Sequence, residues 1–553
     1  MTLRVRWLGR VGYHEALALQ RALVASSSDH LLLLEHPPVY TLGVRADPAD
    51  VLVPAASVGA DVVRSDRGGE VTYHGPGQLV AYPVLSVPGR RGGGMADTVA
   101  YVRSLEQLII DALADLGLAG AGRDPRHRGV WVAGAKVCAV GVRLARSRSM
   151  HGFALNVDPD LAMFDHIVAC GIRDRGVTSL AALGVEVTMA QVVDAVVGRA
   201  VERWGGGGWE RQDVAWPSGR SVDASAFSGG TASVDPGGHG TATPVRLAVR
   251  LAGAGVGPGL DRSARKPSWL RAGAHLGPEY RGLERTVRGL GLTTVCEEAG
   301  CPNIFECWAE GTATFMINGE RCTRACGFCL VDTRHPEGPP DDDEPGRVAE
   351  AVERLGLDHA VVTAVARDDL ADGGAGAFAA TVAAVRRRVP GCAVEVLIPD
   401  CKGDADALDA VFAARPDVCN HNLETVARLQ RAVRPSAGYA RSLAVLARAR
   451  AAGLVTKSGL IVGMGETDEE VVGALADLAG VGVDIVTVGQ YLRPTARHLP
   501  VARWVEPATF ERFRHVGLGL GIGHVEASPL TRSSHHARQS LAAVTARHAA
   551  ATG

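Results

Sequence analysis

The residues of this chain with the most distinctive chemistry lie in one short stretch. Six of its 11 cysteines fall within 34 residues, as two groups of three. A cubane iron–sulfur cluster has four irons, so three protein thiolates leave one iron open to another ligand. Two such groups predict two clusters, each with one reactive corner. The spacings are C-x4-C-x5-C and C-x3-C-x2-C: Cys296, Cys301 and Cys307, then Cys322, Cys326 and Cys329.

Disulfides and zinc are the alternatives to iron. The chain begins MTLRVRWLGR, without the apolar segment of a signal peptide, so an oxidising compartment and paired disulfides are not expected. Cys326-x-x-Cys329 alone fits a zinc knuckle, but no second C-x2-C and no histidine pair accompanies it. Spacing therefore favours iron–sulfur and leaves structural zinc open.

The residues around the cysteines resemble lipoyl synthase, a member of the radical S-adenosylmethionine enzymes. The resemblance covers essentially everything from Arg265 to about residue 540. It is carried by TVCEEAGCPNIFECWAEGTATFMINGERCTRACGFC (294–329), ARDDLADGG (366–374), VEVLIPD (394–400), NHNLETV (420–426), TKSGLIVGMGET (456–467), GQYLRPT (489–495) and RSSHHA (532–537).

This resemblance implies a role for each cysteine group. The second group would hold the cluster whose open iron binds S-adenosylmethionine, the source of a 5′-deoxyadenosyl radical. The first would hold an auxiliary [4Fe-4S] cluster that is consumed as the sulfur source, with Ser534 as its fourth ligand. Sulfur would enter at C6 and C8 of a protein-bound octanoyl chain. One departure is His535, where family members usually have tyrosine.

Three further motifs lie in the first 204 residues. RGGEVTYHGPGQ (67–78) is a glycine-rich loop, GAKVCAVG (134–141) places Lys136 in a strand-like run, and Cys170 lies within the segment 151–180. Taken alone, each has an ordinary explanation. Glycine-rich loops are often plain turns, a lysine there usually lies on a solvated face, and a lone cysteine is often an inert small hydrophobe.

Together the three motifs resemble the lipoyl(octanoyl) transferase family, which shares its fold with lipoate and biotin protein ligases. The resemblance makes Cys170 the nucleophile and Lys136 its activating partner. Cys138 departs from the family pattern and is interpreted as a packing residue. The acyl site would comprise Arg67, Gly68, Gly69, Glu70, Val71, Thr72, Tyr73, His74, Ala139, Val140, Gly141, Gly152, Phe153 and Ala154.

The chemistry of this pair is consistent with acyl transfer. A free thiol has a pKa of about 8.5, so a base must help to form the thiolate at neutral pH. Cys170 would attack the thioester of octanoyl-acyl carrier protein, and Lys136 would then deprotonate the acceptor lysine. Backbone amides at 139–141 and 152–154 are expected to stabilise the oxyanion. An ATP-dependent ligase is less expected, because no P-loop is present.

Composition indicates two halves joined by a linker. Residues 205–245 are rich in Gly, Ser, Thr, Ala, Asp and Pro, and such a segment buries too little surface to order itself. It separates a predicted octanoyltransferase domain at 1–204 from a lipoyl synthase domain at 246–553. The net charge of −2 gives no nucleic-acid footprint. With no apolar run of 18 residues, a cytoplasmic protein without a membrane span is expected.

The pattern of elements differs between the halves. In the first, apolar runs at 30–42, 78–87 and 129–144 predict strands, mixed with a helix that starts near residue 97. This half is predicted to be an α+β domain of the lipoate/biotin-ligase type. After residue 348, helices alternate with short strands, which indicates an α/β radical SAM partial TIM barrel.

Polar residues at the barrel's strand ends are candidate substrate positioners. Arg367, Asp368, Asp369, the segment Asn420–Glu424 and Lys457 are the candidates, although each alone more often forms a barrel-end ion pair. Three other cysteines lack ligand spacing and are predicted to be core thiols: Cys392, Cys401 and Cys419.

The two resemblances together predict a bifunctional lipoate-assembly enzyme. The expected partners are octanoyl-acyl carrier protein, the lipoyl carrier domains of 2-oxoacid dehydrogenases and of the glycine cleavage H protein, and a low-potential donor such as ferredoxin or flavodoxin. Two alternatives remain. One half could serve only as a carrier-docking module, or the second half could be a biotin synthase-like enzyme, which the auxiliary cysteines and the RSS motif disfavour.

Overall fold

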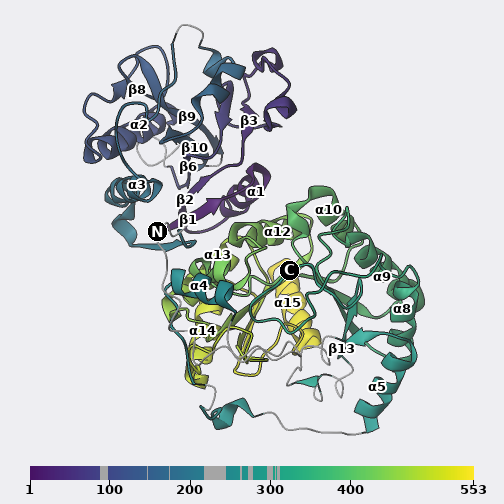
Figure 1. Cartoon of the computed structure of the whole chain (residues 1–553). Coiled ribbons are helices and arrows are strands. Elements are labelled where there is room, and N and C mark those ends of the chain that lie inside the picture. Colours follow the sequence, from purple (N-terminus) through teal and green to yellow (C-terminus); the bar gives the residue numbers. More distant parts are fainter. Residues whose placement is uncertain are drawn as a thin grey trace. The chain divides into compact units, whose positions relative to one another are not determined.

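A computed structural model gives the structure of the chain (Figure 1). It describes residues 1–552 except 88–96, 146, 173–174, 217–243, 262–263, 272–277, 295–302, 305–306 and 308–311. Cys296 and Cys301 therefore lie outside the described residues. The chain divides into two compact units, Met1–Trp216 and Pro217–Gly553.

The first unit is built on an eight-stranded sheet. Strands β11, β1 and β2 run parallel, and the others pair antiparallel. Helices α2 (Thr98–Asp115) and α3 (Met189–Trp204) bury their apolar sides in the same core as the sheet. In order across the sheet the strands are β11 (Trp209–Asp213), β1 (Leu3–Arg10), β2 (Asp29–Glu35), β6 (Gln78–Val84), β10 (Arg148–Asn156), β9 (Ala135–Ala145), β8 (Val130–Val132) and β7 (Gly122–Arg123).

A three-stranded sheet completes this unit. Its strands are β4 (Asp61–Arg64), β3 (Val39–Leu42) and β5 (Val71–His74), in that order. Helix α1 (Tyr13–Leu23) also belongs to the unit. The predicted α+β class is confirmed. The main sheet extends into the segment assigned by composition to the linker, since β11 pairs with β1 and the ring of Trp216 stacks on Trp7 at 4.3 Å.

The second unit is an open α/β barrel. Its sheet has the order β12 to β19, with β12 antiparallel and all the others parallel. Within the described part of the chain, β19 pairs only with β18, so the barrel is partial, as predicted. The strands are β12 (Thr293–Thr294), β13 (Thr312–Ile317), β14 (His359–Ala364), β15 (Ala393–Leu397), β16 (Val418–Asn420), β17 (Val455–Val462), β18 (Ile485–Gln490) and β19 (His524–Ala527).

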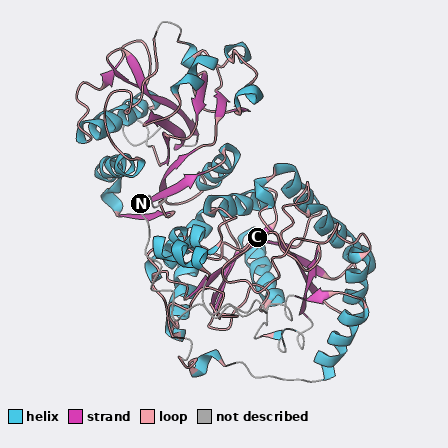
Figure 2. Ribbon diagram, in the orientation of Figure 1, coloured by secondary structure: helices cyan, strands magenta, loops and turns pink. Residues whose placement is uncertain are grey.

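Helices follow the strands and form the outer layer of the barrel (Figure 2). Their small apolar residues pack on continuously buried strands such as β13, in keeping with a parallel sheet covered by helices. No described helix has the length and apolar character of a membrane span. The helices are α4 (Val245–Gly253), α5 (Pro278–Gly289), α8 (Glu344–Leu355), α9 (Ala375–Arg388), α10 (Ala405–Ala413), α11 (Gln430–Val433), α12 (Tyr439–Ala451), α13 (Asp468–Gly480), α14 (Pro507–Gly519) and α15 (Ala537–Thr552).

Candidate functional sites

The first unit contains a cavity of about 650 Å³, a size typical of small-molecule sites. Both Cys170 and Lys136 line it. So do twelve of the fourteen residues predicted for the acyl site: Arg67, Gly68, Gly69, Glu70, Thr72, His74, Ala139, Val140, Gly141, Gly152, Phe153 and Ala154.

Backbone connections explain how Lys136 and Cys170 come to share this cavity. Lys136 N donates to Gly176 O and Thr178 N donates to Lys136 O, both at 2.9 Å. The segment that follows Cys170 is thereby fixed alongside β9. Cys170 lies in a short turn at φ 55°, a left-handed conformation that costs about 1–2 kcal/mol for a non-glycine residue. The thiol is half-buried and belongs to no disulfide.

Lys136 is buried rather than solvated, with 7% of its surface exposed. Its Nζ lies 5.0 Å from the centroid of the Trp131 ring, within cation–π distance. The ordinary expectation for a lysine in a strand, an exposed face, is therefore wrong here. A buried amine facing a cavity that contains a thiol is suited to proton transfer.

Arg67 organises the glycine-rich loop from inside. Its guanidinium donates to Thr41 O at 2.6 Å, to Glu70 O at 2.8 Å and to Gly68 O at 3.1 Å. A β-carbon at Gly43 would lie 2.4 Å from Gly69 O and 2.9 Å from Arg67 Nη1, so a side chain there would displace both the loop and the guanidinium. The loop is thus a fixed wall of the cavity rather than a plain turn.

Strand alternation divides the predicted loop residues of β5 between two faces. Thr72 and His74 line the cavity. Val71 and Tyr73 do not line it. They belong to the hydrophobic cluster on the other face of the three-stranded sheet, where the ring of Tyr73 contacts Phe164 edge-on. Their placement in the acyl site is corrected here, because successive side chains on a strand point to opposite faces.

His74 is held as a neutral imidazole. Burial lowers its pKa well below the usual range, and His36 and Arg67 lower it further. Gln78 Nε2 donates to Tyr73 O and to Asn156 Oδ1, so Gln78 Oε1 is the acceptor for His74 Nδ1–H at 2.7 Å. This assignment leaves His74 Nε2 as a hydrogen-bond acceptor.

The structure distinguishes the two segments expected to supply oxyanion donors, 139–141 and 152–154. Phe153 and Ala154 pair with β6 on one side and β9 on the other, so their amides are engaged by the sheet. Strand β8 pairs with β9 only over Ala135–Cys138, so the same edge of β9 is not covered by β8 beyond Cys138. Gly68 N donates to Val142 O on the uncovered edge, and Val140 presents its amide on that same edge by strand alternation. Val140 N–H is therefore the better-placed donor.

Other cavity residues were not singled out from the sequence. Tyr82 and His151 line the cavity. Tyr82 donates to His36 Nε2 at 2.8 Å and His151 Nε2 contacts Asp66 at 2.7 Å. Position alone could have pointed to His151, which directly precedes Gly152 in a matched motif. Tyr82 lies in an apolar strand run and carried no such signal.

In the second unit, the loop after β13 carries the three cysteines predicted to hold the radical SAM cluster. Cys322, Cys326 and Cys329 are half-buried and unpaired. Burial raises the pKa of the Cys329 thiol to about 12, and the neighbouring Cys326 and Cys322 contribute to the shift. Three partly buried thiols on one loop suit thiolate ligation of an iron–sulfur cluster.

Neighbouring segments hold this loop in place. Gly327 N donates to Val433 O at 2.8 Å, and Leu499 N donates to Gly327 O at 3.0 Å. His498 Nε2 lies 2.9 Å from Cys329 O. Loops that follow several different strands thus meet at the carboxyl end of the barrel.

The candidate positioners all form internal ion pairs or hydrogen bonds. Arg367 binds Asp369 at 2.9 Å. Lys457 Nζ contacts both carboxylate oxygens of Glu395 at 3.0 Å, and Asn420 donates to the same carboxylate at 2.9 Å. Lys457 and Glu395 are fully buried, so this pair forms part of the barrel interior.

The remaining barrel cysteines lie in the core. Burial raises the pKa of each of the three thiols, and the one group of close metal-ligand atoms among the described residues does not include them. They are Cys392, Cys401 and Cys419, all less than 9% exposed.

Part of the predicted auxiliary site is described. Cys307 is 7% exposed, and its amide donates to Asn303 O at 3.0 Å. Asn303 Nδ2 in turn donates to Leu530 O at 2.7 Å, four residues before Ser534. A hydrogen-bonded bridge therefore places the Cys307 turn beside the RSS segment.

His535 packs beside the predicted serine ligand. Its ring stacks on His536 with centroids 3.8 Å apart, and His536 Nδ1 lies 3.5 Å from Glu526. Ligand atoms of Glu526, His535 and His536 all lie within 4.8 Å of one another. This cluster adjoins Ser534, the predicted fourth ligand of the auxiliary cluster.

Comparisons with known proteins decide the family. The lipoyl protein ligase A/B catalytic domain model matches residues 12–200, and the radical SAM superfamily model matches residues 316–478. Lipoyl synthase of Rubrobacter xylanophilus is 58% identical over 276 residues, which cover 50% of this chain and 86% of that protein. Lipoyl synthase of Mycobacterium ulcerans is 54% identical over 308 residues, 55% and 93% of the two chains.

The chain belongs to the lipoyl synthase family. Its first half adds a catalytic domain of the lipoyl protein ligase type, so two enzymatic domains of lipoate biosynthesis are fused. An acyltransferase and a radical SAM sulfurtransferase are accordingly joined in one chain. The cofactors are S-adenosylmethionine and two [4Fe-4S] clusters.

Proposed function

We propose that this chain assembles protein-bound lipoyl groups in two steps. The first transfers octanoyl from octanoyl-acyl carrier protein to a lysine of a lipoyl carrier domain through a Cys170 thioester. The second inserts sulfur at C6 and C8 of that octanoyl chain. The observation that carries the first step is one cavity lined by both Cys170 and Lys136.

Each transfer step balances with these two residues. Neutral Lys136 Nζ accepts the Cys170 proton, and the thiolate attacks the donor thioester carbonyl. The carrier thiolate leaves and takes that proton, so octanoyl remains on Cys170. Lys136 Nζ then accepts a proton from the acceptor lysine amine as it attacks, and returns it to the departing Cys170 thiolate. Val140 N–H would donate to the oxyanion in both steps.

The second step depends on residues suited to hold two clusters. We assign Cys322, Cys326 and Cys329 to the radical SAM cluster, and assign Cys296, Cys301, Cys307 and Ser534 to the auxiliary cluster. When bound, these groups with S-adenosylmethionine supply a hydrogen-abstracting radical and the inserted sulfur. The chain's own contribution is to fix the cysteine loop and to exclude water from the barrel end.

The proposal includes partners and a location. The acceptors would be lipoyl carrier domains of 2-oxoacid dehydrogenases and of the glycine cleavage H protein. Ferredoxin or flavodoxin would supply electrons in the cytoplasm. We propose that the segment between the two catalytic domains serves as a flexible linker, which its composition supports.

The test is an anaerobic assay of the full chain with octanoyl-acyl carrier protein, apo carrier domain, S-adenosylmethionine and a reductant, read by mass spectrometry. Cys170→Ser should abolish octanoylation while a pre-octanoylated carrier is still lipoylated. Cys326→Ala should do the converse.

Two outcomes would contradict the proposal. Octanoylation by Cys170→Ser at the wild-type rate would remove the thioester step. Zinc in place of about eight irons, which two cubanes require, would remove the cluster assignment. If only one activity appears under every condition, the silent half is a carrier-docking module instead.

A further inference from the structure

The residues between Cys322 and Cys326 connect the cysteine loop to the chain that follows strand β14. Thr323 N and Thr323 Oγ1 both donate to Ala366 O, at 2.9 and 2.8 Å. Asp368 N donates back to Thr323 Oγ1 at 3.0 Å. Ala366 and Asp368 follow β14, the strand beside β13. The loop is thus fixed to its neighbour within one residue of Cys322.

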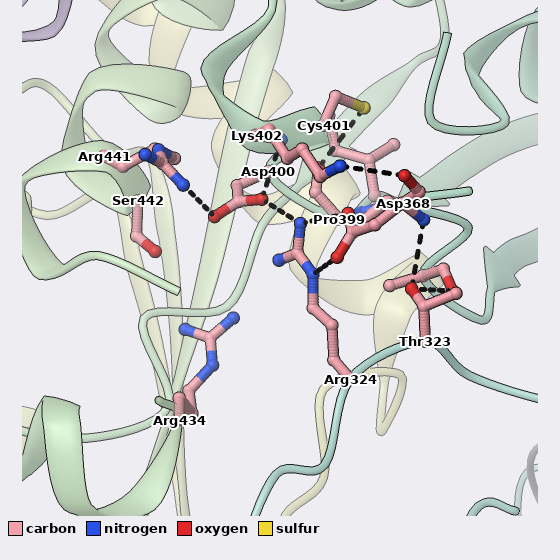
Figure 3. A network of polar contacts seen from close by, with 12 residues as sticks. Thr323, Arg324, Asp368, Pro399, Asp400, Cys401, Lys402, Arg434, Arg441 and Ser442 are labelled. Carbon is pink, nitrogen blue, oxygen red and sulfur yellow. Dashed lines mark hydrogen bonds and ion pairs between the residues drawn. The ribbon is translucent and has the colours of Figure 1, made fainter. Parts of the chain in front are cut away.

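Arg324 extends this connection to a third strand end. Nε and Nη2 donate to the two oxygens of Asp368 at 2.8 Å each. Nη2 also lies 2.6 Å from Asp400 Oδ1, and Asp400 follows β15. Figure 3 shows the guanidinium between the two carboxylates. The side chain is 6% exposed, so the pairing is shielded from water and salt.

The carboxylate of Asp400 requires a cationic partner, because its side chain is fully buried. Burial alone would raise the pKa of this carboxyl, but Arg324 holds it below its usual range. Lys402 N donates to Asp400 Oδ1 at 3.1 Å, and Lys402 Nζ donates to Asp368 O at 2.8 Å. The Asp400 carboxylate is therefore held independently of Arg324, and Lys402 also fixes the main chain at Asp368.

We propose that Arg324 is a positioning residue that clamps the cysteine loop across three strand ends and contributes charge beside the cluster. The inference rests on the proposed assignment of Cys322, Cys326 and Cys329 as ligands. Groups that orient metal ligands change metal affinity by about 10–100-fold when they are removed. A bidentate guanidinium provides such orientation, whereas a lysine ammonium would supply charge without the planar geometry.

The experiment compares anaerobically reconstituted full chains of wild type, Arg324→Lys, Arg324→Gln and Asp400→Asn. The first readout is the rate at which an iron chelator bleaches the cluster absorbance. We expect bleaching to be about 10-fold faster or more for Arg324→Gln, and intermediate for Arg324→Lys. Arg450→Gln is the matched control, because it breaks another partly buried pair, with Asp484 at 2.9 Å, before β18.

The second readout is the midpoint potential of the radical SAM cluster, followed by electron paramagnetic resonance during a redox titration. Loss of the Arg324 charge should lower this potential, and loss of the Asp400 charge should raise it, because net charge near a cluster sets its potential. A merely structural loosening would shift both variants in the same direction. Circular dichroism identifies any variant that fails to fold.

Wild-type bleaching rates in Arg324→Gln, or potential shifts of the same sign in Arg324→Gln and Asp400→Asn, would overturn the clamp. If Arg324→Gln does not fold, Arg324→Lys and Asp400→Asn decide: bleaching at the wild-type rate in Arg324→Lys, or a potential in Asp400→Asn that is not raised, would overturn the clamp. Loss of the cluster in Cys326→Ala together with unchanged Arg324 variants would reject the clamp and leave the proposed function standing.

Discussion

At the scale of single residues, environment rather than residue type separates reactive from inert groups. Cys138 and Cys170 are both thiols near Lys136, yet Cys138 is fully buried and Cys170 is half-buried at a left-handed turn. Burial raises the pKa of Cys138 far above that of a free thiol, although Lys136 opposes the shift. Cys170 therefore faces the cavity, whereas Cys138 is packed in the core of the main sheet.

This difference predicts selective alkylation in the first unit. Iodoacetamide should modify Cys170 in the native full chain and leave Cys138 unmodified, because only the thiolate is nucleophilic and burial suppresses it. Peptide mass spectrometry measures both. Cys138→Ala should retain octanoyl transfer and lose about 1 kcal/mol of stability. Modification of Cys138 at the rate of Cys170 would contradict its assignment to the core.

Lys136→Arg tests proton transfer separately from charge. Arginine keeps the positive charge but cannot be deprotonated in proteins. We expect octanoyl transfer to fall by about 10²–10⁴-fold, the usual contribution of a general base. Lys266→Arg makes the same chemical change at an exposed position of the second unit and should leave the rate unchanged. Transfer by Lys136→Arg within a factor of a few of wild type would exclude the base role.

His36 should make the first unit sensitive to acid. It is fully buried, donates to Val11 O and accepts from Tyr82, and burial lowers its pKa to about 4. Because the unfolded chain binds the proton more readily, stability is complete above pH 6.5 and falls as the pH drops toward 4. The loss at pH 5 is about 2 kcal/mol.

Hydrogen exchange of β2 and β6 peptides, corrected for intrinsic rates, measures this loss. Wild-type protection should fall about 30-fold more between pH 8 and pH 5 than protection in His36→Gln, which has no titrating ring. Equal pH dependence in the two proteins would show that other groups dominate acid unfolding.

At the scale of elements, apolar runs were sufficient to locate the strands but not their neighbours. The runs that predicted β2, β6, β9 and the barrel strands are confirmed, because alternation and short buried runs are local signals. The carboxylate partners of Arg324 were beyond prediction, since they follow different strands and only the parallel order of the barrel brings them together. Val71 and Tyr73 were misplaced because a motif match ignores strand alternation.

Two glycines of the first unit should respond oppositely to alanine. A β-carbon at Gly152 on β10 would lie 2.5 Å from Pro83 Cδ and closer still to Ala81 O, both on β6. Gly152→Ala should therefore destabilise the unit by about 1–3 kcal/mol and impair octanoyl transfer. Gly198 lies within α3 with nothing near its β-carbon, so Gly198→Ala should stabilise by about 0.4–1 kcal/mol. Thermal unfolding measures both, and destabilisation by Gly198→Ala would contradict the described packing of α3.

At the scale of the whole molecule, fusion matters only if the octanoylated carrier reaches the second site before it escapes. A flexible segment with the length and composition of residues 217–243 has a typical reach of about 30 Å. Flexible tethers of this kind give effective concentrations near the millimolar range. The advantage should therefore be large in dilute solution and vanish as the free carrier concentration approaches that range.

Separating the two activities onto different molecules tests this directly. Cys170→Ser mixed with Cys326→Ala supplies each activity on a different chain. In a single turnover at micromolar protein, wild type should yield lipoylated carrier with a shorter lag than the mixture. The lag of the mixture should lengthen on dilution, because its intermediate must diffuse between chains. Wild type cleaved at a protease site inserted within 217–243 should behave like the mixture while retaining both activities. Equal lags at every dilution would mean that the halves work independently and that fusion contributes no local concentration of the intermediate.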